Sequence, residues 1–170
     1  VLCMDDEQIR SLIPSLSRPF VTYGFDVEAD YRIIAYRQEG TRSYFSVSYR
    51  NNEPWAFCLN LPGRHNAENA TAVLAVALEE GVSPQVVGRA FEQFSGVGRR
   101  FQIYGDYAIP EGGRVMLVDD YGHHPKEIAA TLQAIRQGWP DRRLVMVYQP
   151  HRYTRTRDLF DDFCQILSKP

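Results

Sequence analysis

Two short apolar segments in the second half of the chain, each followed by a helical pattern, limit what the sequence can fold into. Residues 114–119 and 144–148 are rich in Val, Leu and Met and have the length of strands. Residues 125–137 and 156–168 instead repeat apolar side chains at helical spacing. Alternating apolar strands and helices are typical of a parallel sheet covered by helices. Because two parallel strands make a poor sheet by themselves, we expect a truncated, Rossmann-like parallel α/β unit.

The first half of the chain carries a different pattern, in which turn signals separate strand signals. Residues 31–37 and 42–50 are rich in Tyr, Ile, Phe, Val and Ser, and they flank a Gln-Glu-Gly-Thr turn signal at 38–41. A third strand signal covers residues 55–61. This order predicts an antiparallel β meander. Helical periodicity over residues 64–80 predicts that a helix follows the meander.

A stretch rich in Pro and Gly at residues 109–113 is the expected linker between these two parts. We therefore expect residues 1–108 to form one domain and residues 109–170 to form another. The fold class expected for the whole chain is α/β, with the meander and its helices first and the parallel unit second.

The net charge and the cysteines exclude several classes of protein. A formal net charge of −2 gives no broad basic field for binding nucleic acid. No apolar run approaches the roughly 20 residues that cross a bilayer. Cys3, Cys58 and Cys164 are far apart and odd in number, unlike a disulfide framework or a zinc site. We expect a cytoplasmic protein with no resident zinc that binds neither nucleic acid nor membrane.

The start of the predicted helix after the meander carries polar side chains in the motif LPGRHNAENA at residues 61–70. Gly63 allows a tight turn or a close approach of the backbone. Asn66 and Asn69 are three residues apart and share a helix face. An amide donates and accepts at once, which suits the edge of an adenine ring. A capped helix start with solvated polar side chains is the other interpretation.

Two further loops carry arginines. The motif FSGVGRRF at residues 94–101 sets Arg100 beside glycines, and a guanidinium there could meet a phosphate or belong to a plain surface loop. The motif QPHRYTRTRD at residues 149–158 contains Arg152 and Arg155 just after the second apolar segment. A carboxylate or phosphate ligand would explain this patch, and a basic loop that faces RNA or solvent is the alternative.

The motif DDYGHHP at residues 119–125 follows the first apolar segment, at the edge of an α/β sheet where ligands bind. Two Asp and two His also suggest a metal site. Adjacent side chains of an extended segment point to opposite faces, so all four cannot reach one ion. A ligand-binding loop, a strand-end turn and a metal site therefore remain as interpretations.

Taken together, the motifs LPGRHNAENATA, FSGVGRRFQ, DDYGHHPKEIAATL and QPHRYTRTRDLFDDF resemble those of the Mur ligases, ATP-dependent amide-forming enzymes of peptidoglycan assembly. The resemblance covers nearly the whole chain, and the last two motifs are most similar to the branch of the family that adds L-alanine to UDP-N-acetylmuramate. The resemblance implies that residues 1–108 are the later part of the central ATP-binding domain. Residues 109–170 would then begin the amino-acid-binding C-terminal domain.

The resemblance also implies which residues contact the nucleotide. Asn66 and Asn69 match positions that approach adenine, with His65 beside them. Asp120 matches a carboxylate that binds the ribose hydroxyls, and Tyr121 lies next to the nucleotide.

The remaining implied roles concern the reaction, which forms an acyl phosphate that the alanine amine then attacks. Arg100 matches an arginine that reaches the γ-phosphate, where charge must be neutralised. His123, Arg152 and Arg155 match residues that hold the incoming alanine, whose carboxylate suits a guanidinium. Arg100 and His123 are the residues expected to act in catalysis.

The sequence departs from the family pattern in one respect. A phosphate loop with a Gly-Lys pair is expected in the parent enzyme, and no Gly-Lys pair occurs in this sequence. The magnesium ligands and the UDP-binding domain should precede Val1. We therefore expect a chain that is inactive by itself. A non-catalytic nucleotide-binding homologue, an RNA-binding module and a Mur ligase for another amino acid are the alternatives.

Overall fold

The computed structural model describes residues 1–110 and 112–168, which form two compact units, Val1–Ser95 and Gly96–Pro170. The sequence instead predicts a boundary after residue 108. The difference arises because strands on both sides of the expected linker, residues 109–113, pair with each other. Glu111 of that expected linker lies outside the described residues.

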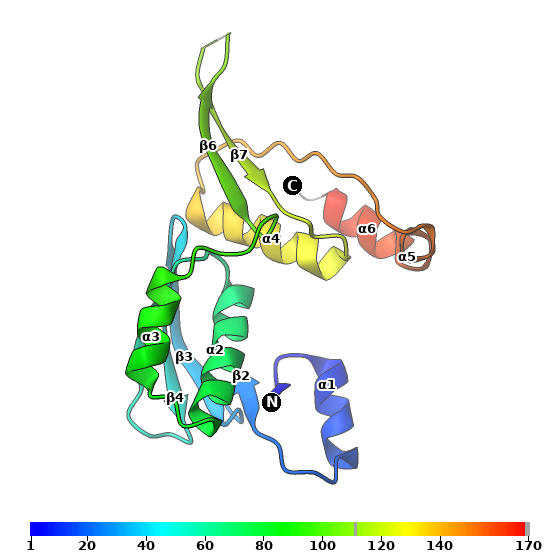
Figure 1. The fold of residues 1–170 in the computed structure, drawn as a ribbon. Helices are drawn as coiled ribbons and strands as arrows, with labels where there is room; N and C mark the ends of the chain where they lie inside the picture. Colours follow the sequence, from blue (N-terminus) through cyan, green and yellow to red (C-terminus); the bar gives the residue numbers. More distant parts are fainter. Residues whose placement is uncertain (111, 169–170) are drawn as a thin grey trace. The chain divides into compact units, whose positions relative to one another are not determined.

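The first unit contains a mixed sheet, whose strands follow the order β1-β2-β3-β4-β5 within the described part of the chain (Figure 1). The strands are β1 (Leu2–Cys3), β2 (Thr22–Gly24), β3 (Tyr31–Glu39), β4 (Arg42–Tyr49) and β5 (Trp55–Leu59). The first three strands run parallel. The strands β3, β4 and β5 pair antiparallel, with a bulge between Ile33 and Ala35. The predicted antiparallel meander is confirmed.

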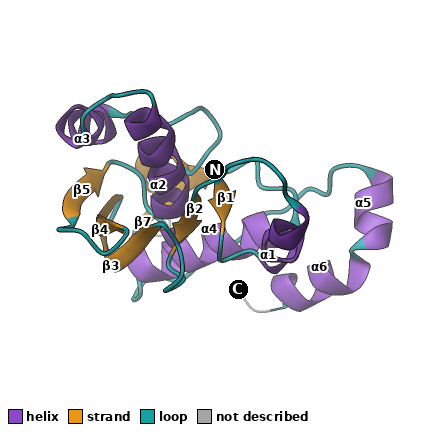
Figure 2. Ribbon diagram, turned by 90° about the horizontal axis from the view of Figure 1, so that it is seen from below, coloured by secondary structure: helices purple, strands orange, loops and turns teal. Residues whose placement is uncertain are grey.

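Alternate side chains of the meander form a core with α2 (Arg64–Glu79) and α3 (Pro84–Gln93), which cover one face of the sheet (Figure 2). The buried core consists of Tyr31, Ile33, Phe45, Val47, Phe57, Leu59, Ala67, Ala70, Leu74, Ala75, Val87 and Phe91. The helix α2 contributes mostly alanines, so its backbone can lie close to the sheet. The N-terminal helix α1 (Glu7–Leu12), which the 3₁₀ turn η1 (Ile13–Ser15) follows, has no buried residue.

The second unit contains a two-stranded antiparallel sheet and three helices among its described residues. The strands are β6 (Gln102–Ala108) and β7 (Arg114–Asp119). The helices are α4 (Pro125–Gly138), α5 (Tyr153–Asp158) and α6 (Phe160–Leu167). Ile128 and Leu132 of α4 pack against Phe163 of α6. The single helix predicted over residues 156–168 is instead two helices, because Leu159 leaves the helical conformation, with φ −116° and ψ 27°.

The segment 144–148 differs from its prediction, because it is not a β-strand and β7 pairs antiparallel with β6. Leu144, Met146 and Tyr148 still pack on the core, while Val145 and Val147 are 71% and 95% exposed, so the alternation of a strand remains. A pair of parallel strands without neighbours on both edges is poorly stabilised. A cavity of about 550 Å³ lies among β7, α4 and this segment.

No helix in the described ranges is long and apolar enough to cross a membrane.

Candidate functional site

The turn after β7 is joined to the loop before β6 by the carboxylate of Asp120. Its Oδ2 accepts a hydrogen bond from the Phe101 N–H at 2.9 Å, and its Oδ1 accepts one from the Gly122 N–H at 2.7 Å. The Tyr121 N–H also donates to the Arg99 carbonyl at 2.7 Å. Two motifs that lie some twenty residues apart in the sequence are therefore one connected loop system.

The backbone of this loop system is held in an uncommon conformation. Arg99 and Phe101 have positive φ angles of 59° and 47°, which non-glycine residues seldom adopt and which fold contacts must stabilise. The Phe101 ring supplies such a contact, because it is buried and stacks on Trp139 with ring centroids 6.1 Å apart. The exposed Arg100 between them is thus presented from a loop that is fixed on both sides.

The two arginines of the loop have different partners. Arg99 Nε lies 3.3 Å from Asp119 Oδ2, and its guanidinium lies 4.6 Å from the centre of the Tyr121 ring. Arg100 is 60% exposed, and its Nη1 approaches Glu127 Oε1 only to 3.7 Å. Arg99 is therefore part of the loop's framework, whereas Arg100 can turn toward an anion without breaking a close contact.

Glu127 organises the start of α4. Its Oε2 accepts hydrogen bonds from the backbone N–H groups of His123 at 2.9 Å and His124 at 3.1 Å, as in a capping box. Partial burial raises the pKa of Glu127, but these two hydrogen bonds and the nearby charges of His123 and Arg100 outweigh it, so the pKa lies below its usual value. Glu127 therefore stays ionised and fixes the two histidines.

Three rings from two loops gather beside this helix start. The Tyr121 and His123 ring centroids are 5.2 Å apart, and His151 lies 6.0 Å from each. His123 Nδ1 lies 2.9 Å from the Tyr121 carbonyl, so Nε2 is the nitrogen that can meet a ligand. The structure therefore brings together the motif that follows β7 and the motif that follows the segment 144–148, which the sequence predicts at one common edge.

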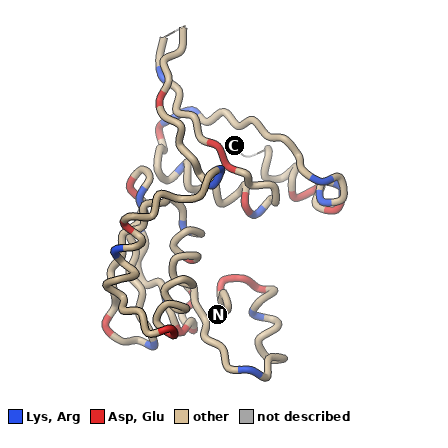
Figure 3. The backbone as a smooth tube through the Cα atoms, in the orientation of Figure 1, with Lys and Arg blue, Asp and Glu red and all other residues tan. Residues whose placement is uncertain are grey.

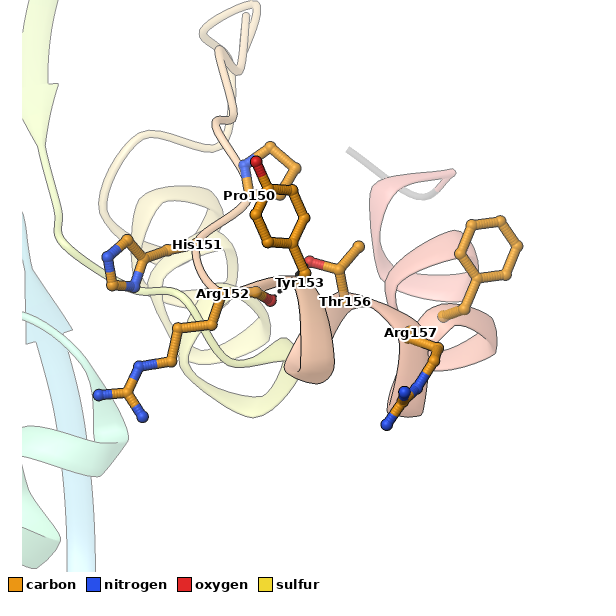
Figure 4. A pocket seen from close by; sticks show the side chains of 7 residues that line it. Pro150, His151, Arg152, Tyr153, Thr156 and Arg157 are labelled. Carbon is orange, nitrogen blue, oxygen red and sulfur yellow. Dashed lines mark hydrogen bonds between the residues drawn. The ribbon is translucent and has the colours of Figure 1, made fainter.

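The loop after residue 150 lines a cavity of about 650 Å³ (Figure 4). Figure 4 shows the side chains of His151 and Arg152 on one side of this loop, with Tyr153 pointing away from them. The Arg155 Nη1 donates to the His151 carbonyl at 3.3 Å, one turn back along α5. Arg152 thus lies on the same side of the loop as His151, whereas Arg155 is bonded to the backbone just before its own helix. Figure 3 shows basic residues gathered at α5 and acidic residues where β7 ends.

The remaining predicted residues belong to the first unit, at the start of α2. The Asn66 Nδ2 donates to the Pro62 carbonyl at 2.7 Å, while Asn69 is exposed and His65 is half-buried. The turn passes through Gly63, whose φ of 100° favours glycine. Asn66 is thus bonded to the turn, but no described side chain caps the start of α2, and Asn69 faces solvent.

The sequence interpretation missed two residues that organise these loops. Gln38 accepts a hydrogen bond from the Gly63 N–H at 3.0 Å, but it lies in a turn signal and looks like a turn residue. Glu127 lies three residues after His124, and that spacing is the capping-box signal that could have found it.

Comparison with known proteins identifies both parts of the chain. The Mur ligase middle domain matches residues 1–77, and the Mur ligase, glutamate ligase domain matches residues 99–170. The solved UDP-N-acetylmuramate-alanine ligase of Thermotoga maritima is 28% identical, with a TM-score of 0.69 over 87% of this chain and 36% of that chain.

Two other solved structures share the fold. The murein peptide ligase of Psychrobacter arcticus is 27% identical, with a TM-score of 0.57 over 84% of this chain and 29% of that one. The MurF ligase of Thermotoga maritima in complex with ADP has a TM-score of 0.63 over 79% of this chain and 30% of that one, and its 17% identity shows the fold alone. The chain spans about a third of the length of these proteins. Two matching ligase domains and a shared fold establish that the chain belongs to the Mur ligase family.

Proposed function

We propose that the chain is part of an enzyme that uses ATP to join L-alanine to UDP-N-acetylmuramate. Membership of the Mur ligase family supports a parent that is an ATP-dependent amide ligase of peptidoglycan synthesis. The choice of L-alanine is supported by the likeness to the UDP-N-acetylmuramate-alanine ligase. In this proposal the first unit, Val1–Ser95, belongs to the central domain, and the second unit, Gly96–Pro170, belongs to the amino-acid-binding domain.

The observation that carries the proposal is the loop system built on Asp120. It presents an exposed arginine, Arg100, from a fixed backbone. It also holds Tyr121 and His123 beside His151, next to Arg152. A cationic group for a phosphate and a polar, ring-lined place for a small amino acid are what an acyl-phosphate mechanism needs.

The proposed reaction has two steps. A muramate carboxylate oxygen attacks the γ-phosphorus of ATP, and ADP leaves. The alanine amine then attacks the acyl carbon, loses a proton, and inorganic phosphate leaves. Arg100 neutralises charge on the phosphoryl oxygens, and electrostatic stabilisation of this kind is usually the largest single term in catalysis. Arg152 and Arg155 bind the alanine carboxylate, and His123 Nε2 orients the amino acid without blocking its nitrogen.

The described residues support a contact with the nucleotide but offer no site for a metal ion. Asn69 is exposed one turn after the start of α2, which supports a contact between its amide and an adenine. Among residues 1–110 and 112–168, no three His, Cys, Asp or Glu side chains are grouped so that they could hold a metal ion. We therefore derive no step through magnesium from this chain. With no Gly-Lys pair for a phosphate loop, we propose that the chain alone does not turn over.

The test compares the intact parent ligase with this chain by release of inorganic phosphate. We expect release from the parent only when ATP, UDP-N-acetylmuramate and L-alanine are all present, and none from the chain. Release that is supported equally by glycine or by D-glutamate would refute the choice of L-alanine. A parent that binds ADP but releases no phosphate with any amino acid would instead be a non-catalytic homologue.

A further inference from the structure

The side chain of Gln38 ties the β3–β4 hairpin to the turn that starts α2. Its Oε1 accepts hydrogen bonds from the Gly63 N–H at 3.0 Å and from the Tyr36 hydroxyl at 3.3 Å. Its Nε2 donates to the Gly40 carbonyl at 3.0 Å. A carboxamide can accept and donate at once, so Gln38 joins three groups that a purely accepting or purely donating side chain could not.

The Gly63 end of this link sits directly before α2. Gly63 is buried, and its φ of 100° and ψ of 136° belong to a region that favours glycine. The carbonyl of Gly63 accepts the hydrogen bond of the Asn66 N–H at 3.0 Å, within the first turn of the helix. A displacement of Gly63 would therefore displace the whole first turn of α2.

The first turn of α2 has a second attachment to the unit. The guanidinium of Arg64 lies 3.2 Å from the centre of the Phe25 ring, and Phe25 in turn contacts the edge of Tyr36. Both attachments thus involve Tyr36 of β3, which contacts Phe25 and donates a hydrogen bond to Gln38. The hairpin thus contacts the start of α2, while Asn69, one turn later, stays exposed.

We propose that Gln38 is a positioning residue, which sets the place of the α2 N-terminus against the adenine of a bound nucleotide. The inference rests on the proposed function in one respect, the assignment of Asn66 and Asn69 to adenine. Gln38 itself does not touch the nucleotide. It acts through the Gly63 N–H, because the position of Gly63 determines where the helix that carries Asn66 and Asn69 begins.

Three variants of the 170-residue chain test this role. Gln38→Met keeps the length of the side chain but has no oxygen for the Gly63 N–H. Gln38→Glu keeps that acceptor and loses the donor to the Gly40 carbonyl. Glu39→Gln is the matched control, because Glu39 is the next residue on β3, is 58% exposed and pairs with Arg37.

The measurements are calorimetric affinities for ADP and GDP, and the amide exchange rate of Gly63. Loss of one hydrogen bond should weaken ADP binding by about fivefold in Gln38→Met. In the same variant the ratio of ADP to GDP affinity should fall, and amide exchange at Gly63 should quicken by a similar factor. Gln38→Glu should restore both the affinity ratio and the exchange rate, and Glu39→Gln should change neither. If ADP and GDP weaken equally, Gln38 has only a structural role and the proposal is overturned.

The design separates this inference from the proposed function. If the unsubstituted chain binds no ADP, the same variants are compared in the intact parent ligase, which has the phosphate loop. An ADP-to-GDP affinity ratio that Gln38→Met leaves unchanged there would refute the nucleotide part of the inference. Exchange at Gly63 still decides whether Gln38 holds the turn. Unchanged exchange in Gln38→Met would overturn that part as well.

Discussion

Replacing Asp120 by asparagine removes the acceptor that joins the two loops of the second unit. The side-chain oxygen of asparagine can keep one of the two hydrogen bonds, at 2.9 and 2.7 Å, while its NH₂ group then faces an N–H donor. A hydrogen bond to a charged acceptor contributes about 1.5–3 kcal/mol, and the site is only partly buried, so we expect a loss of about 2 kcal/mol in the free energy of unfolding.

The assay is urea unfolding followed by the fluorescence of Trp139, which stacks on the neighbouring Phe101. The sequence has two tryptophans, so a Trp55→Phe background leaves Trp139 as the reporter of the second unit. Asp119→Asn is the matched control, because Asp119 pairs with the exposed Arg99, and an exposed ion pair contributes about 0–1 kcal/mol. Equal losses for the two variants would refute the assignment of Asp120 as the link between the loops.

Three further predictions concern pH and backbone strain. The pKa of Glu127 in the folded protein lies below its ordinary value of 4.5, so its carboxylate stabilises the fold fully above pH 4.5. Urea titrations should therefore show the largest loss of stability in Glu127→Gln above pH 4.5, and this loss should disappear as the pH falls through the lowered pKa. Burial beside Tyr49 raises the pKa of Tyr31 from 10.0 to about 12, so stability should fall between pH 10 and 12, and less so in Tyr31→Phe. Gly24→Ala should lower the melting temperature more than Gly40→Ala. Both glycines have positive φ, but a Cβ at Gly24 would lie 2.6 Å from the Asp5 carboxylate, whereas a Cβ at Gly40 would meet no atom of the described residues within 4 Å. Equal shifts of the melting temperature would contradict this reasoning.

The sequence predicts the meander well because the pattern there is local. Alternating apolar side chains and a turn signal determine how β3, β4 and β5 pair. The strand β6 gives no such signal, because its residues are mostly exposed and Gly105 lies at a bulge. The segment 144–148 has the composition of a strand, but strand pairing depends on neighbours that composition does not supply.

The sequence predicts which motifs form the site, but it does not predict the contacts that join them. The sequence indicates that Asp120, His123 and Arg100 lie in loops near ligand-binding edges, and the structure places them in one unit. It does not indicate the hydrogen bond from Phe101 to Asp120, because that bond depends on positive φ angles at two non-glycine residues. The roles of the nine predicted site residues stay predictions until binding is measured.

The open edge of β7 makes the second unit prone to self-association. In the described part of the chain β7 pairs on one side only, and Val115 and Leu117 are about half exposed. An unpaired strand edge with apolar side chains is a template on which a strand of another molecule can add. Arg114 and Asp119 at the ends of β7 are the charges that oppose such stacking. We therefore expect self-association at high concentration to involve this edge, and a charged residue at position 117 to reduce it.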